Sequence, residues 1–266
     1  MEPPAERILA NLRDVRGRIA AAAARSGRPP QAVRLVAVTK AVDPDAIRIL
    51  AEAGQKDIGE NRPQQLRDRA RLLADPSAGS GQALGIAWHM IGQLQRNKVK
   101  YVVPAAAMIH SIDRLDLAEE ISRRACLAVA GTATEALDGP PATAGQVEES
   151  PRRPGRATRA VCLLEINSGE EQKAGVPAAE APALARAVAA LPGIDLVGLM
   201  TLAPLAENPE TVRPIFAALR QLLERVNREA APPRPLSELS MGMTQDYEAA
   251  VEEGATIVRV GTALFR

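Results

Sequence analysis

The stretch VRLVAVTK at residues 33–40 gives the strongest indication of the fold. It is a short apolar run rich in β-branched residues, and the prolines at 29–30 and the pair Asp43 and Pro44 bound it on either side. Such a run is typical of a strand that is buried on both faces in a parallel sheet. A helix is predicted directly after it over residues 44–53, with Pro44 in its first turn. A strand followed at once by a helix is the unit from which parallel α/β folds are built.

The same unit recurs along the rest of the chain. Seven further strands are predicted at residues 57–59, 87–91, 108–111, 159–166, 194–200, 238–240 and 256–260. Helices are predicted after them at residues 62–73, 95–101, 113–129, 178–190, 209–228 and 246–252, and one more precedes the first strand at residues 6–25. Eight alternating units fit a closed barrel better than an open doubly wound sheet. The sequence therefore predicts an α/β fold with a single domain over residues 1–266, a (β/α)8 TIM barrel with an extra N-terminal helix.

Two segments lie outside this alternation. Residues 75–85 form a loop of small residues, and residues 131–157 are rich in Gly, Pro, Ala, Thr and Glu but poor in large apolar side chains. The second segment cannot bury enough apolar surface to offset the entropy of ordering it. It is predicted to be a disordered insertion before the fifth strand, tolerated at the surface rather than regulatory.

The composition excludes several classes of function. The 266 residues carry 33 Lys and Arg against 32 Asp and Glu, so the net charge of +1 gives no reason to expect nucleic acid or an anionic membrane as partner. Aromatic residues make up 2% of the chain, which is too few for a surface that stacks bases. No stretch is long and apolar enough for a membrane span, and the charged N-terminus lacks the apolar core of a signal peptide.

Cysteine and histidine are scarce as well. Cys126 and Cys162 show neither a close pair nor a metal-type spacing, and they are predicted to be two buried thiols in a reducing compartment. His89 and His110 cannot supply a His-rich metal site, so a satisfied polar role near the barrel is expected for both. No predicted helix shows an oversized apolar face. We therefore expect a cytoplasmic monomer that binds no metal.

Polar residues end most of the predicted strands. In barrels of this type the carboxyl ends of the strands carry the active site, so these residues are candidates for a ligand site. They are Lys40, Glu60, Asn61, His89, Gly92, Gln93, His110, Ser111, residues 167–169, Thr201, residues 240–244, Arg259, Gly261 and Thr262. Such a ring is too polar for a packing surface and predicts that a ligand binds at this end of the barrel.

Lys40 comes directly after the first strand, at the mouth of the predicted barrel. One interpretation is a side chain that extends its ammonium to water. The other is an amine whose pKa is lowered by partial burial and that can form a Schiff base with a carbonyl compound. The residue taken alone favours the first interpretation, and anion-binding groups nearby would favour the second.

The loops after the last two strands can supply those groups. Residues 240–244 (SMGMT) follow the seventh strand, and Gly261 and Thr262 follow the eighth. Loops at these two positions often bind phosphate through backbone N–H groups. Arg259 lies just before them and is expected to face the lumen, where it either forms a salt bridge, with Glu165 as one candidate, or faces a heteroaromatic nitrogen of a ligand.

At these residues the sequence resembles the pyridoxal phosphate homeostasis proteins of the YggS/PROSC type. The stretches that carry the resemblance are LVAVTK (35–40), GQKDIGEN (54–61), WHMIGQLQRNKVK (88–100), IHSID (109–113), NSGEEQKAG (167–175), GLMT (198–201) and LSMGMTQDYEAAVEEGATIVRVGTALF (239–265). Three features depart from the family pattern: the long insertion at 131–157, Arg62 and Pro63 after GEN, and the ending LFR.

The resemblance implies a barrel similar to the N-terminal domain of alanine racemases, with pyridoxal 5′-phosphate as its cofactor. Lys40 would carry the cofactor as an internal aldimine, Arg259 would face its pyridine nitrogen, and the last two loops would hold its phosphate. The cofactor-binding residues implied in this way are Lys40, Asn61, Ser240, Met241, Arg259, Gly261 and Thr262. The implied function is intracellular homeostasis of vitamin B6, with PLP-dependent apo-enzymes as candidate partners and no catalytic residue.

An enzyme of the amino-acid racemase type is the alternative. Racemases of this kind place a tyrosine opposite the lysine, and this chain has only Tyr101 and Tyr247, both in predicted helices. They also cover the site with a following β-domain, whereas this sequence ends at Arg266. We therefore expect a binding protein and leave weak racemase-type activity open. A Schiff-base aldolase for sugar phosphates is a third interpretation, which the position of Lys40 on the first strand disfavours.

Overall fold

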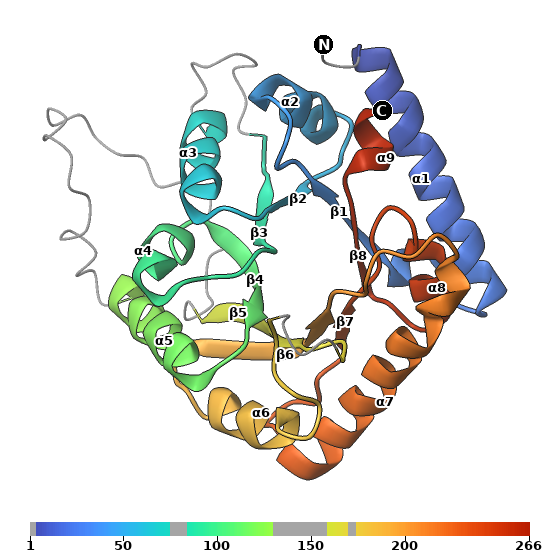
Figure 1. Cartoon of the computed structure of the whole chain (residues 1–266). Coiled ribbons are helices and arrows are strands. Elements are labelled where there is room, and N and C mark those ends of the chain that lie inside the picture. Colours follow the sequence, from blue (N-terminus) through green and yellow to red (C-terminus); the bar gives the residue numbers. More distant parts are fainter. Residues whose placement is uncertain (1–3, 75–83, 130–158, 170–173) are drawn as a thin grey trace, which may run out of the picture.

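The computed structural model describes residues 4–74, 84–129, 159–169 and 174–266. Its strands are parallel and close into a barrel in which each strand pairs with the next and the last pairs with the first (Figure 1). They are β1 (Arg34–Val38), β2 (Asp57–Glu60), β3 (Ala87–Met90), β4 (Ala106–Ile112), β5 (Ala160–Ile166), β6 (Ile194–Thr201), β7 (Glu238–Ser240) and β8 (Ile257–Val260). The predicted (β/α)8 TIM barrel is confirmed, and each predicted strand is found.

Helices surround this barrel on its outer side (Figure 1). They are α1 (Ala5–Arg25), α2 (Pro44–Glu52), α3 (Pro63–Ala74), α4 (Val99–Val102), α5 (Leu115–Val129), α6 (Ala181–Ala189), α7 (Arg213–Ala230), α8 (Tyr247–Glu252) and α9 (Thr262–Phe265). The helix predicted over 95–101 is a 3₁₀ turn at Arg96–Lys98 followed by the single turn α4. The short helix α9 is not predicted by the sequence, because four residues are too few to show a helical period.

The extra N-terminal helix α1 packs against the helices that close the chain. Its stripe of Ile8, Leu12, Val15 and Ile19 is buried, as the 3.6-residue period requires. Figure 1 shows α1 running alongside α8 and α9. This contact covers the outer side of the barrel where β8 meets β1.

The interior of the barrel contains an apolar layer and a polar one. Five buried side chains form the apolar layer, separate from the outer core between strands and helices: Val36, Met108, Leu163, Met200 and Ile257. The polar groups described below lie in the same lumen. Because successive side chains of a strand point to opposite faces, single polar residues can enter the lumen while their neighbours pack outward.

Some predictions concern residues that the structure does not describe. The predicted insertion at 131–157 and most of the loop at 75–85 lie outside the described residues. Among the described helices, none is both long and apolar enough to cross a membrane. Neither cysteine forms a disulfide, and Cys162 is buried as predicted. The prediction of burial is wrong for Cys126, which lies on the exposed face of α5.

Candidate functional site

The carboxyl ends of the strands bring the predicted site residues to one mouth of the barrel. Lys40 follows β1 by two residues, Asn61 follows β2, and Gly261 follows β8. The N–H group of Gly261 donates to Thr244 Oγ1 at 3.3 Å, which joins the loops after β7 and β8. A Cβ on Gly261 would lie 3.1 Å from the carbonyl oxygen of Val38, so this loop also lies against the end of β1.

Lys40 lies in a tight turn at this mouth. The Val42 N–H group donates to the Thr39 carbonyl at 3.2 Å and closes the turn. Lys40 is exposed, which agrees with the interpretation that its side chain extends its ammonium to water rather than with partial burial. The reason is that β1 ends at Val38, and the turn carries Lys40 past the end of the barrel wall. Its amine is therefore accessible to a ligand that enters from solvent.

A buried cluster holds this turn from behind. Arg69 of α3 donates to the carbonyl oxygens of Thr39, at 2.7 Å, and Val42, which are the two ends of the turn. Arg69 also forms a buried ion pair with Glu60, whose Oε1 accepts the Thr39 hydroxyl at 2.6 Å. Sequence analysis placed Glu60 among the strand ends but missed Arg69, because nothing in its helix marks it as facing inward. The cluster fixes the backbone on either side of Lys40.

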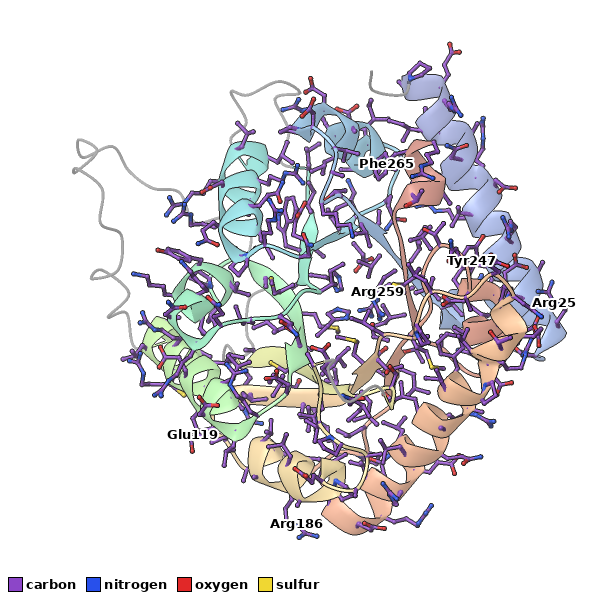
Figure 2. The ribbon with its side chains drawn as sticks, viewed as in Figure 1. Arg25, Glu119, Arg186, Tyr247, Arg259 and Phe265 are labelled. Atoms are coloured by element: carbon purple, nitrogen blue, oxygen red, sulfur yellow. The ribbon has the colours of Figure 1, made fainter. Side chains whose placement is uncertain are left out.

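Arg259 lies inside the barrel (Figure 2) and is buried. Its Nη1 donates to Ser240 Oγ at 2.6 Å, and its Nη2 donates to the Thr201 carbonyl at 2.9 Å. No carboxylate of the described residues lies within 4.0 Å of it, so the candidate salt bridge with Glu165 is not formed. Burial lowers the pKa of Arg259 to about 10, and the guanidinium still carries its charge at neutral pH. A buried cation without an ionic partner is costly, and an acceptor on a ligand would offset that cost.

The residues at and after the ends of β7 and β8 differ in what they offer to a ligand at this mouth. The Ser240 hydroxyl contacts Arg259 and His110, at 2.6 and 2.9 Å. Met241 packs in the outer apolar core, and its N–H group donates to the Ile257 carbonyl at 3.1 Å. Thr262 is exposed at the start of α9. An anion here would therefore meet Thr262 rather than the Ser240 hydroxyl or the Met241 side chain.

Several buried polar atoms near this mouth lack a hydrogen-bond partner among the described residues. They are Asn61 Oδ1, Ser111 Oγ, Glu165 Oε2 and Ser168 Oγ. These residues stand near the ends of β2, β4 and β5. An unpaired buried polar atom costs about 1–3 kcal/mol, and such atoms are rare in native proteins. Their gathering at one place suits a ligand that brings donors and acceptors of its own.

Burial raises the pKa of Glu165 to about 7, and Asp113 adds to this rise while Arg259 opposes it. The carboxyl group is thus partly protonated at neutral pH. A protonated carboxyl can donate a hydrogen bond, whereas the ionised form only accepts one.

The free energy of unfolding of the ligand-free protein is expected to fall as the pH rises, and Glu165→Gln is expected to remove this fall. The folded pKa of about 7 lies above the ordinary 4.5, so the stabilising contribution is full below pH 4.5 and is lost as the pH rises through 7. The wild type should lose up to ~3 kcal/mol more than the variant across this window. Urea unfolding at pH 4.5 and pH 8 measures the effect, with the exposed Glu119→Gln as control. An equal change in the free energy of unfolding between these two pH values for the wild type and Glu165→Gln would contradict the prediction.

Both tyrosines lie on helices, as predicted. Tyr247 begins α8 and packs toward α1 outside the barrel wall, with the Arg18 guanidinium 5.4 Å from its ring centroid (Figure 2). Tyr101 lies on α4, with the Arg67 guanidinium 4.6 Å from its ring centroid. Each ring thus contacts helix residues, and neither is held at the strand ends beside Lys40.

The two histidines lie in the interior of the barrel. His89 Nδ1 and His110 Nε2 are 2.9 Å apart, and both residues are buried. Their predicted polar role is therefore confirmed. In the part of the chain that the structure describes, His, Cys, Asp and Glu side chains form no group of three that could hold a metal ion.

Known proteins share this architecture and sequence over nearly the full chain. A family model described as alanine racemase, N-terminal domain, matches residues 10–266. A protein of Aquifex aeolicus named pyridoxal phosphate homeostasis protein is 38% identical over 249 residues, which cover 93% of this chain and 92% of that protein. A solved structure of an unknown protein from Bifidobacterium adolescentis is 38% identical with a TM-score of 0.77, and the match covers 98% of this chain and 95% of that one. PipY from Synechococcus elongatus, solved with PLP bound, is 30% identical with a TM-score of 0.73 over 97% of this chain and 100% of PipY.

Proposed function

Because this chain belongs to the pyridoxal phosphate homeostasis proteins, whose fold is that of the alanine racemase N-terminal domain, we propose that it binds pyridoxal 5′-phosphate and takes part in the homeostasis of this cofactor. One observation carries the proposal. The exposed amine of Lys40 and the buried guanidinium of Arg259 belong to the same mouth of the barrel, together with buried polar atoms that lack partners.

The residues at this mouth fit the cofactor. When bound, the cofactor supplies an aldehyde that reacts with a primary amine and a pyridine ring that withdraws electrons. Lys40 would hold the aldehyde carbon, and Asn61, whose Oδ1 is buried without a partner, would contact the ring. Arg259 would donate to the pyridine nitrogen and keep it unprotonated, which weakens the ring as an electron sink. Gly261 and Thr262 would contact the phosphate, with the loop at Ser240 and Met241 behind them.

Borohydride reduction tests this assignment directly. The chain contains five lysines, which are Lys40, Lys56, Lys98, Lys100 and Lys173. Reduction in the presence of pyridoxal 5′-phosphate, followed by peptide mass mapping, should label the peptide that contains Lys40. A label on another lysine, or none, would overturn the assignment.

We further propose that the protein binds the cofactor without turning over amino acids. A two-base racemase needs a second acid or base opposite the lysine. The rings of Tyr101 and Tyr247 contact residues of the outer helices, and the two histidines hydrogen-bond to each other. With alanine in D2O, the loaded protein should exchange the Cα hydrogen no faster than free cofactor does. Faster exchange that yields both enantiomers would instead establish the racemase alternative. The sugar-phosphate aldolase interpretation gains no support from the relatives described.

Gly92→Ala is expected to weaken cofactor binding through Asn61. A Cβ at position 92 would lie 2.3 Å from the Asn61 carbonyl oxygen and 2.8 Å from its Cα, so Asn61 must move. We expect a loss of ~1–3 kcal/mol in the free energy of unfolding and a higher Kd for pyridoxal 5′-phosphate. Gly17→Ala is the control, since a Cβ there would meet nothing within 4 Å. Thermal unfolding and a spectroscopic titration measure both effects, and an unchanged Kd in Gly92→Ala would show that Asn61 makes no contact with the cofactor.

We also propose a monomer in the cytoplasm that supplies the cofactor to PLP-dependent apo-enzymes. Of the large apolar side chains that are exposed in the described residues, Leu72 lies on α3, Leu205 follows β6, and Leu115 and Leu127 lie near opposite ends of α5 rather than next to each other. The free thiols of Cys126 and Cys162 suit a reducing compartment. Sedimentation should give a mass near 28.2 kDa, and a mass of twice that value would contradict the monomer.

A further inference from the structure

A continuous line of polar side chains crosses the interior of the barrel. It consists of Asp57, His89, His110, Ser240 and Arg259, from β2, β3, β4, β7 and β8, and we call it the polar line. The atom pairs Asp57 Oδ1–His89 Nε2, His89 Nδ1–His110 Nε2 and His110 Nδ1–Ser240 Oγ are each 2.9 Å apart. The pair Ser240 Oγ–Arg259 Nη1 is 2.6 Å apart. Branched apolar residues usually fill such a lumen, so a hydrogen-bonded line there calls for a role.

The chemistry of the line's two ends determines where each hydrogen lies. Arg259 only donates, so Ser240 Oγ accepts from it, and the hydroxyl hydrogen is left to donate to His110 Nδ1. His110 must then carry its hydrogen on Nε2 and donate to His89 Nδ1. His89 in turn carries its hydrogen on Nε2.

The other end of the polar line agrees with this order, in which each group donates to the next one from Arg259 toward Asp57. An ionised Asp57 only accepts, and His89 Nε2 faces its Oδ1. In this order of donors and acceptors both rings hold the same tautomer, with the hydrogen on Nε2. If each of these hydrogen bonds ran the other way, His89 Nε2 would carry no hydrogen and would face a carboxylate oxygen, unless the ring held a second proton.

The surroundings of His110 favour its neutral form. Burial lowers the pKa of His110 well below its usual range, and the nearby His89, Arg259 and Arg34 act in the same direction. Two acidic groups, Glu165 on β5 and Asp246 in the loop before α8, raise the pKa of Arg259 and so oppose the effect of its burial.

The line also connects the two ends of the barrel. Asp57 is the first residue of β2, and its side chain is 30% exposed, whereas those of His89 and His110 are buried. It lines a cavity of about 420 Å³ at the amino ends of the strands, together with Arg34 and Lys56. The line thus runs from this cavity to Arg259 in the site.

We propose that Asp57, His89 and His110 are positioning residues that act through Ser240 on Arg259. They orient the Ser240 hydroxyl away from Arg259, so that its oxygen remains an acceptor and holds the guanidinium in place. This proposal rests on the proposed function in so far as Arg259 faces the cofactor. None of the three residues contacts the cofactor in this arrangement.

Nitrogen NMR of the imidazole rings tests the line without the cofactor. The chain has only two histidines, so their ring nitrogens can be assigned without ambiguity. In cofactor-free protein at pH 7, both rings should be neutral with the hydrogen on Nε2. A His110 hydrogen on Nδ1, or a charged His110, would overturn the proposal even if the protein binds pyridoxal 5′-phosphate normally.

Two variants of His110 test the effect on the site. His110→Leu removes the acceptor of the Ser240 hydroxyl hydrogen, whereas His110→Asn keeps an oxygen near the position of Nδ1. His110→Leu should bind pyridoxal 5′-phosphate roughly tenfold more weakly, as expected for one hydrogen bond to a charged group. It should also shift the absorption maximum of the bound cofactor, and His110→Asn should restore both properties toward the wild type. Equal affinity and spectrum in the wild type and His110→Leu would overturn the proposal.

Asp57→Leu provides the same test if His110→Leu does not fold, because Asp57 is partly exposed. In Asp57→Leu the hydrogen of His89 should no longer be confined to Nε2 in the NMR spectrum, and the absorption maximum of the bound cofactor should shift in the same direction as in His110→Leu. Asp57→Asn keeps an acceptor and should resemble the wild type. An Asp57→Leu protein with the wild-type tautomers and spectrum would contradict the proposal. If the wild type fails to bind the cofactor at all, the proposed function fails, while the NMR result still decides the direction of the line.

Discussion

Lys40→Ala is expected to abolish the covalent retention of pyridoxal 5′-phosphate while the barrel stays folded. The side chain supplies the amine for the proposed link, and no other lysine lies in the turn that follows β1. Lys40 is exposed and lies beyond the end of β1 at Val38, so its removal costs little packing. After borohydride treatment and denaturation, the variant should carry no cofactor by absorbance or mass, which is a complete loss rather than a partial one.

Lys56→Ala is the matched control for this experiment. Lys56 precedes β2 at the opposite end of the barrel, where its Nζ donates to the Leu84 carbonyl at 2.8 Å. This variant should retain a full equivalent of cofactor. Circular dichroism of Lys40→Ala should match that of the wild type. A Lys40→Ala protein that still carries one equivalent would show that the covalent link lies elsewhere.

Arg69→Met is expected to be among the most destabilising substitutions at the site. Arg69 and Glu60 form a buried ion pair, and removal of the guanidinium leaves the Glu60 carboxylate buried without its ionic partner. The loss of one partner from a buried pair costs about 3–5 kcal/mol. The carbonyl groups of Thr39 and Val42 also lose the hydrogen bonds that Arg69 donates to them, so the turn that carries Lys40 loosens. Urea unfolding measures the loss, and slower labelling of Lys40 should accompany it.

Two further variants separate the ion pair from a general effect on helix α3. Arg71→Met, at an exposed position of the same helix, should change the free energy of unfolding by less than ~0.5 kcal/mol. The double variant with Glu60→Gln and Arg69→Met should cost less than the sum of the single variants, because it leaves no buried charge whereas each single variant leaves one. Additive losses would show that the two side chains act independently.

The fold could be predicted from the sequence because its determinants are local. Most strands are short apolar runs, as at residues 33–40, and most are followed by an amphipathic helix. The closure of the barrel then follows from the number of units and their parallel direction. The fold class and the alternation of apolar and polar residues can therefore be predicted from near neighbours along the chain.

The candidate site could be predicted only as a set of strand ends. Lys40, Asn61 and Arg259 were identifiable because parallel strands place their carboxyl ends together. Arg69 was not, because an arginine in a helix is ordinarily exposed and its partner Glu60 becomes adjacent only when α3 folds against β2. Whether Lys40 is exposed or partly buried could not be decided from the sequence for a related reason, since the exact end of β1 depends on its pairing with β2.

The sequence by itself therefore determined the barrel and the mouth at which a ligand would bind. Only the tertiary structure decided what surrounds each polar group: that Arg259 meets Ser240 and Thr201 rather than Glu165, and that His89 meets His110 across the lumen. The physical reason is the range of the forces involved. Backbone preferences and hydrophobic periods act between near neighbours along the chain, whereas a hydrogen bond between side chains requires an approach of about 3 Å that strands far apart in sequence reach only after the barrel has closed.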